Sequence, residues 1–243
     1  MYFLYHKQRS LFETVKCLKF CYFLLFVLVV SCADQNKSQN EGVKSSESSK
    51  TAADQGQKEK IILCFGDSIT AGYGLEDNSE AYPGVLQAKI DSLNWNFEVI
   101  NSGLSGETTS GGLSRINWIL NQQIDYFILE LGANDGLRGI PLDETRSNLK
   151  KIIETVQSKD DRITIILAGM ELPPNMGEEY ITEFRTIFSE LAEMYDLPFI
   201  PFILNNVGGV QELNQADGIH PTAEGHKIVA ENVWEVLHPL LTP

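Results

Sequence analysis

Cysteine and basic residues are both scarce in this 243-residue sequence, and each shortage excludes a class of protein. Of the four cysteines only Cys64 lies beyond residue 32, so that part of the chain can form neither an internal disulfide nor a cysteine-based metal site. Cys64 stands in an apolar stretch and is interpreted as a small core residue. The 19 basic residues face 33 acidic ones, giving a formal net charge of −14. Such a surface repels phosphate backbones, so we expect no nucleic-acid partner.

The apolar run Phe20–Val30 is also short. It has 11 residues, whereas a helix that crosses a bilayer needs roughly 20. Basic residues precede it and the small residue Ser31 follows it, a pattern typical of a cleaved export signal. Val29-Val30-Ser31-Cys32 further resembles a bacterial lipobox, which predicts that Cys32 carries lipid. An ordinary signal peptide with an incidental cysteine is the alternative.

These features predict three segments. Residues 1–31 form a lipoprotein-type signal peptide, residues 32–59 a disordered polar tether without apolar periodicity, and residues 60–243 one folded domain. The mature protein is then expected to be exported and held by its N-terminal lipid to a bacterial membrane, facing the periplasm or the exterior.

Short apolar runs alternate with helical periods from Lys60 onward, which predicts a parallel sheet covered by helices on both faces. The expected fold class is α/β, a three-layer α/β/α sandwich with a five-stranded parallel sheet. The expected strands are 60–65, 96–101, 125–131, 162–169 and 197–203. The expected helices are 81–93, 109–122, 143–158, 178–195 and 222–238. Pro201 suggests that the last strand lies at an edge, because proline cannot donate to a ladder.

Ser68 follows the first predicted strand directly, where a hydroxyl can stand above the end of a parallel sheet. A serine needs a base to act as a nucleophile at neutral pH. His220 stands at a Gly-rich turn three residues after Asp217, a spacing that lets the carboxylate orient the ring toward Ser68. By itself Asp-Gly-x-His-Pro is equally typical of a turn before a helix. His226, inside the last helix, is expected to be solvated, and His238 to complement the helix dipole.

An acyl-transfer site also needs donors for the negative charge that develops on the carbonyl oxygen. Gly106 and Asn134 follow the second and third predicted strands, and the Ser68 N–H is a further candidate. The alternative is that Gly106 only permits a turn and Asn134 only caps one. Two other kinds of site are disfavoured. The sequence has no Gly-x-Ser-x-Gly elbow, which the α/β-hydrolase fold uses, and its Gly-rich stretch 103–112 lacks the lysine of a phosphate-binding loop.

Four blocks together resemble the GDSL or SGNH hydrolase family, which is named for a Ser, Gly, Asn and His. They are Gly66-Asp67-Ser68, Ser105-Gly106-Glu107-Thr108, Leu129 to Gly139, and Asp217-Gly218-Ile219-His220-Pro221. The chain is most similar to the exported bacterial thioesterase I, lysophospholipase and arylesterase group. The resemblance implies a flavodoxin-like SGNH hydrolase fold, a Ser68, Asp217 and His220 triad, an oxyanion hole of Ser68, Gly106 and Asn134, and neither a metal nor an organic cofactor.

The resemblance implies small-molecule or lipid acyl esters as substrates: aryl esters, lysophospholipids and acyl thioesters. The candidate substrate-pocket residues are Leu137, Ile140, Leu172, Pro173, Met176 and Ile219, and a monomer is expected. There are three alternatives. One is a carbohydrate O-deacetylase with the same machinery, and another is a non-catalytic surface binding lipoprotein. The third is a metal-dependent hydrolase that uses Asp67, Asp135, Asp217 and His220, and it is disfavoured because one histidine with scattered acids is a poor ligand set for a transition metal.

Overall fold

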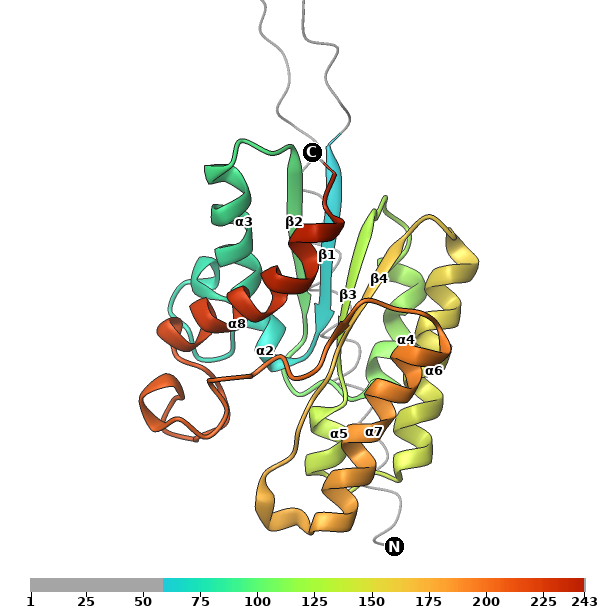
Figure 1. Cartoon of the computed structure of the whole chain (residues 1–243), viewed down its shortest axis with the longest axis vertical. Coiled ribbons are helices and arrows are strands. Elements are labelled where there is room, and N and C mark those ends of the chain that lie inside the picture. The colour runs from blue at the N-terminus through green and yellow to red at the C-terminus, as the bar shows by residue number, and fades with distance from the viewer. Residues whose placement is uncertain (1–58, 243) are drawn as a thin grey trace, which may run out of the picture. The chain divides into compact units, whose positions relative to one another are not determined.

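Five parallel strands form one sheet in the computed structural model, which describes residues 59–242 (Figure 1). Cys32, the predicted signal peptide and all of the predicted tether except Glu59 lie outside the described residues. The strand order is β2-β1-β3-β4-β5, and the pairing is parallel throughout. The strands are β1 (Lys60–Gly66), β2 (Phe97–Gly103), β3 (Tyr126–Glu130), β4 (Thr164–Ala168) and β5 (Phe199–Ile200).

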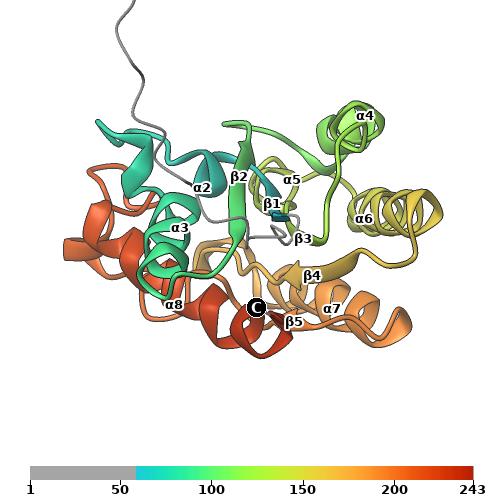
Figure 2. The ribbon, with the colours of Figure 1, turned by 90° about the horizontal axis from the view of Figure 1, so that it is seen from above.

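Helices cover both faces of the sheet, so the predicted three-layer α/β/α fold is confirmed. α3 and α8 lie side by side on one face, and α4, α6 and α7 line the other (Figure 2). Among residues 59–242, no helix combines the length and apolar character needed to cross a membrane. The helices are α2 (Ser68–Ala71), α3 (Tyr82–Ser92), α4 (Thr109–Ile119), α5 (Ala133–Leu137), α6 (Leu142–Lys159), α7 (Glu178–Met194) and α8 (Ala223–Leu237).

The central strands are buried on both sides, which explains their nearly continuous apolar sequences. Every residue from Ile62 to Phe65 in β1 and from Tyr126 to Leu129 in β3 is buried. The last strand is shorter than predicted, with only two residues instead of 197–203. Prolines at 198 and 201 flank it, and neither can donate to the ladder. β5 does lie at the edge, as Pro201 indicated.

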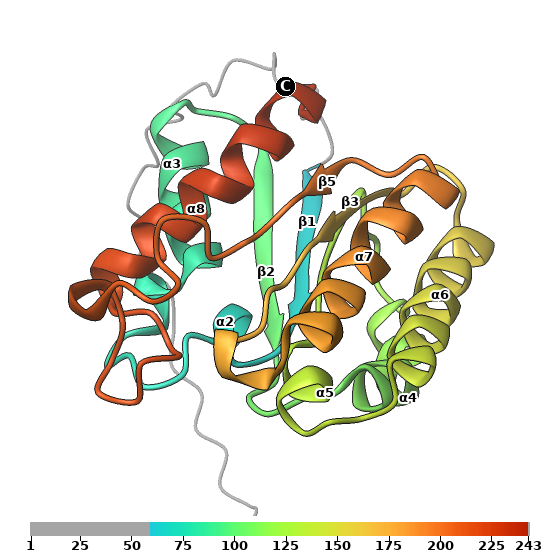
Figure 3. The same cartoon turned by 60° about the horizontal axis from the view of Figure 1, so that its bottom comes forward.

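α2 and α5 begin where β1 and β3 end, on the edge of the sheet that Figure 3 brings forward. Neither is among the helical segments predicted above, because they have only four and five residues. Ligand sites of open parallel sheets lie at this carboxyl edge, close to where the strand order reverses. The reversal here falls between β1 and β3, the two strands that lead into α2 and α5.

His226 was expected to be solvated, and this was wrong. It is fully buried in α8, on the stripe that also holds Val229, Ala230 and Val233. Its Nδ1 accepts a hydrogen bond of 3.2 Å from the N–H of Tyr82 in α3. Burial lowers the pKa of His226 to about 4, with a smaller contribution from the charge of His220. The ring therefore stays neutral in the folded protein over most of the pH range.

We expect this buried imidazole to make folding stability depend on pH. An unfolded histidine has a pKa of about 6.5, so below that pH the unfolded chain binds a proton that the folded one refuses. The stabilisation is present above about pH 6.5 and is lost as the pH falls toward 4. A shift of this size corresponds to about 3 kcal/mol. Urea unfolding at pH 7.5 and 4.5 measures this loss of unfolding free energy.

His226→Asn is the matched variant, since its Oδ1 can accept from Tyr82 and does not titrate in this range. The carboxyl groups titrate in the same way in both proteins. The difference between the two proteins in how the free energy of unfolding depends on pH therefore isolates the contribution of His226. Equal losses of unfolding free energy in both proteins would contradict the assignment.

Candidate active site

The turn from β1 into α2 presents Ser68. Asp67 caps α2, its Oδ1 accepting from the Ile69 N–H at 3.0 Å, and Ser68 is the first helical residue. Gly66 leaves no room for a side chain, because a Cβ there would lie 2.0 Å from Thr70 Oγ1 and 2.3 Å from Glu130 Oε2. This close approach holds the turn tightly against the neighbouring strand β3.

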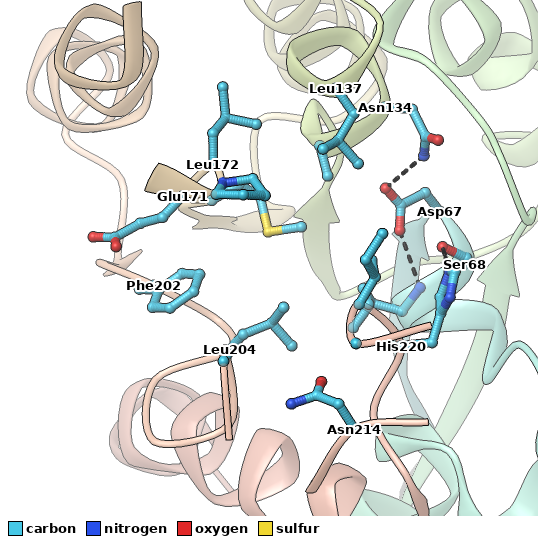
Figure 4. A pocket seen from close by; sticks show the side chains of 18 of the residues that line it. Asp67, Ser68, Asn134, Leu137, Glu171, Leu172, Phe202, Leu204, Asn214 and His220 are labelled. Carbon is cyan, nitrogen blue, oxygen red and sulfur yellow. Dashed lines mark hydrogen bonds between the residues drawn. The ribbon is translucent and has the colours of Figure 1, made fainter. Parts of the chain in front are cut away.

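His220 lies between Ser68 and Asp217, although 152 residues separate it from Ser68. Its Nε2 is 2.9 Å from Ser68 Oγ and its Nδ1 is 2.7 Å from Asp217 Oδ2. Figure 4 shows the Ser68 and His220 side chains meeting at the wall of a pocket. With the proton on Nδ1 held by Asp217, Nε2 is free to accept the Ser68 proton.

Asp217 is held by its own turn as well as by the histidine. Its Oδ1 accepts from the N–H groups of Ile219 at 2.9 Å and His220 at 3.0 Å. Partial burial acts to raise the pKa of Asp217, but these hydrogen bonds and that to the His220 ring outweigh it and lower the pKa to about 2. Asp217 is therefore ionised across the whole physiological range.

Asn134 and Gly106 reach the same site from the ends of β3 and β2. Asn134 Nδ2 donates to Asp67 Oδ2 at 3.0 Å, and its Oδ1 accepts from Arg138 Nη2 at 3.4 Å. These two partners fix which way the amide faces, leaving one N–H for another acceptor. Arg138 Nη2 also donates to the Gly106 carbonyl at 2.9 Å, which links the two candidate donors.

Gly106 adopts a left-handed conformation with φ of 78°, which favours glycine. Its N–H has no acceptor within residues 59–242. The Asn134 amide, the Gly106 N–H and the Ser68 N–H at the start of α2 are thus available to stabilise an oxyanion. Each residue that sequence analysis placed in the triad or the oxyanion hole belongs to this one edge of the sheet.

Two buried carboxyl groups, Asp67 and Glu130, lie in and against the turn that carries Ser68. Sequence analysis placed Asp67 only in the alternative metal site and assigned no role to Glu130. Burial raises the pKa of Asp67 to about 6, against the hydrogen bonds from Ile69 and Asn134. Burial, together with the charge of Asp67, raises the pKa of Glu130 well above its usual value. Glu130 Oε2 accepts from the Asp67 N–H at 3.2 Å and from Thr70 Oγ1 at 2.7 Å. The sequence signal that could have identified Glu130 is an acidic residue at the end of the otherwise apolar strand β3.

A pocket of about 500 Å³ opens beside Ser68 (Figure 4). Of the six predicted pocket residues, four line it: Leu137, Leu172, Pro173 and Ile219. Ile140 and Met176 are not among the lining residues, and Met176 packs partly buried against the core. Sequence analysis missed Ile69, Met170, Phe202 and Leu204. The last two follow β5, a loop that the sequence pattern did not connect with the site.

The alternative metal set is not assembled. Asp135 is buried, and its carboxylate accepts from the Thr109 N–H at 2.8 Å and from the Thr109 hydroxyl. Within the part of the chain that the structure describes, no group of three or more His, Cys, Asp or Glu side chains is placed to hold a metal ion.

Known proteins resemble this chain in sequence and in fold. Residues 64–228 match the model of the GDSL-like Lipase/Acylhydrolase family. The chain is 37% identical over 183 residues to Esterase TesA of Pseudomonas aeruginosa, covering 75% of this chain and 90% of that protein. It is 34% identical over 181 residues to "Thioesterase 1/protease 1/lysophospholipase L1" of Escherichia coli strain K12, covering 74% and 84%. A crystal structure of TesA superimposes with a TM-score of 0.71 at 37% identity, covering 75% of this chain and 100% of that one.

Proposed function

The chain belongs to the GDSL-like lipase and acylhydrolase family and is an ester hydrolase, and on that premise we propose that Ser68, His220 and Asp217 carry out the hydrolysis of acyl esters and thioesters. The observation that carries the proposal is the position of His220, within hydrogen-bond distance of both Ser68 Oγ and Asp217 Oδ2. A histidine so placed can take a proton from the nucleophile while the carboxylate stabilises the resulting imidazolium.

The reaction then proceeds in two halves. Ser68 Oγ attacks the acyl carbonyl carbon as its proton passes to His220 Nε2. The N–H groups of Ser68 and Gly106 and the Asn134 amide stabilise the oxyanion of the tetrahedral intermediate. His220 returns the proton to the departing alcohol or thiol, which leaves an acyl ester on Ser68. Water, deprotonated by His220, attacks this ester. The bond to Ser68 Oγ then breaks as His220 returns the proton to that oxygen, which releases the acid and restores the free enzyme.

The pocket beside Ser68 favours an aliphatic acyl group. Its walls are mostly apolar, with Leu137 and Leu172 on one side and Phe202 and Leu204 across from them (Figure 4). An apolar pocket of this size suits a hydrocarbon chain better than a polysaccharide, whose hydroxyl groups would lose their hydrogen bonds there. The carbohydrate O-deacetylase is therefore the weaker candidate.

Anchoring of the protein to a membrane through lipid on Cys32 stays a prediction.

A panel of substrates tests the acyl preference. Each buried methylene contributes about 0.8 kcal/mol, so p-nitrophenyl hexanoate, with four more methylenes than the acetate, is expected to show a kcat/KM up to about 10²-fold higher. Palmitoyl thioester and lysophospholipid should be cleaved, and acetylated xylan should be a poor substrate. Phe202→Ala is expected to weaken the preference for hexanoate and to leave acetate turnover unchanged. Faster turnover of acetylated xylan than of every longer acyl ester would overturn the proposal.

A further inference from the structure

The segment that carries Asp217 and His220 has little regular secondary structure. Between β5 and α8 it contains only one short helical turn, Gln211–Leu213, and one isolated bridge between Asn214 and Pro221. Asp217 and Ile219 are exposed. Since the Ser68 Oγ to His220 Nε2 distance depends on where this segment lies, some contact has to join it to the turn that carries Ser68.

The side chain of Gln215 makes that contact. Its Nε2 donates to two carbonyl oxygens, that of Tyr73 at 2.6 Å and that of Pro221 at 3.0 Å. One amide group therefore joins the residue that follows His220 to the segment that follows α2. The Gln215 backbone adds a bond of 2.7 Å from its N–H to the His220 carbonyl.

Tyr73, the other end of this link, is tied to the nucleophile. Its N–H donates to the Ser68 carbonyl at 3.0 Å, and its ring lies against the His220 ring with centroids 4.6 Å apart. The next residue, Gly74, packs directly on Gln215: a Cβ there would stand 2.1 Å from Gln215 Oε1. The amide thus sits in a tight space with both of its hydrogens bonded.

We propose that Gln215 is a positioning residue that sets the alignment of His220 with Ser68 by joining Tyr73 to Pro221. The proposal rests on the proposed function of Ser68 and His220. It requires no contact between Gln215 and the substrate, and the side chain does not line the pocket. A misplacement of about 1 Å in a catalytic group can cost 10²-fold in rate, so one lost link can have a large effect.

Gln215→Glu tests the proposal, because glutamate has the same shape but no donors for the two carbonyls. We expect kcat for p-nitrophenyl acetate to fall by about 10- to 100-fold, with KM within about threefold. Gln211→Glu is the matched control: it adds the same charge on the same exposed segment and should leave kcat unchanged. Wild-type kcat in Gln215→Glu would overturn the proposal. If that variant does not fold, Gln215→Met replaces it, because methionine lacks donors and adds no charge. The same fall in kcat and the same small change in KM are expected.

A His220→Ala background separates positioning from general damage. If Gln215 acts through His220, adding Gln215→Glu to His220→Ala lowers the remaining rate by less than about twofold, because the effects are not additive. The same fold-loss in both backgrounds would show that Gln215 acts independently of His220 and would overturn the proposal. Failure of the proposed function is distinguishable, because His220→Ala alone would then retain wild-type activity.

Discussion

Replacing Ser68 by alanine is expected to abolish ester hydrolysis, with a fall in kcat of about 10⁴-fold or more on p-nitrophenyl hexanoate. The reason is that Ser68 Oγ, 2.9 Å from His220 Nε2, is the only group proposed to form the acyl intermediate. Remaining turnover would come from the oxyanion donors and binding alone. The measurement is steady-state kinetics together with covalent labelling by a fluorophosphonate probe, which the variant should not show.

Ser189→Ala serves as the matched control, because Ser189 is exposed in α7, away from the pocket lining. It should keep both wild-type turnover and wild-type labelling. The circular dichroism spectrum of Ser68→Ala should remain that of the parent, since the only hydrogen bond of the Ser68 side chain within residues 59–242 is that to His220. Labelling of a correctly folded Ser68→Ala protein would exclude Ser68 as the nucleophile.

Replacing Asp217 by asparagine is expected to have the second large effect, a fall in kcat of about 10³- to 10⁴-fold near pH 7. The neutral amide neither stabilises the imidazolium nor holds the proton on His220 Nδ1, so Nε2 can carry the proton and no longer act as a base. The pKa of Asp217, lowered to about 2, means that the carboxylate is ionised at every pH above that value. Asp217 should therefore add no acid limb to the wild-type profile of kcat/KM between pH 4 and 9.

Asp160→Asn is the control for this prediction. The pKa of Asp160 is also lowered to about 2, in this case by hydrogen bonds from Arg162, and the residue lies between α6 and β4, at the opposite edge of the sheet. Its replacement should leave kcat unchanged. Near-wild-type kcat in Asp217→Asn would remove Asp217 as the orienting acid and would point to Asp67, whose charge also acts near His220.

Repeating local patterns made the fold class predictable. Parallel strands buried on both faces have to be apolar along their length, and helices on those faces show a period of 3.6 residues, so the alternation from Lys60 onward predicts the sheet and its layers. The last strand was overestimated because apolar composition does not report the hydrogen bonds that Pro198 and Pro201 cannot make. His226 was misjudged because its charged neighbours in sequence, Glu224 and Lys227, occupy another face of α8.

The sequence by itself determined which chemical groups are present and, through the ends of its predicted strands, that Ser68, Gly106 and Asn134 share one edge. Tertiary structure alone decided the distances, because hydrogen bonds act over about 3 Å between residues far apart in the chain. Only the folded chain brings Phe202 and Leu204 to the pocket, places Glu130 against Asp67, and sets Gln215 between Tyr73 and Pro221. A local pattern carries no information on such contacts, since each depends on how separate loops pack at the edge of the sheet.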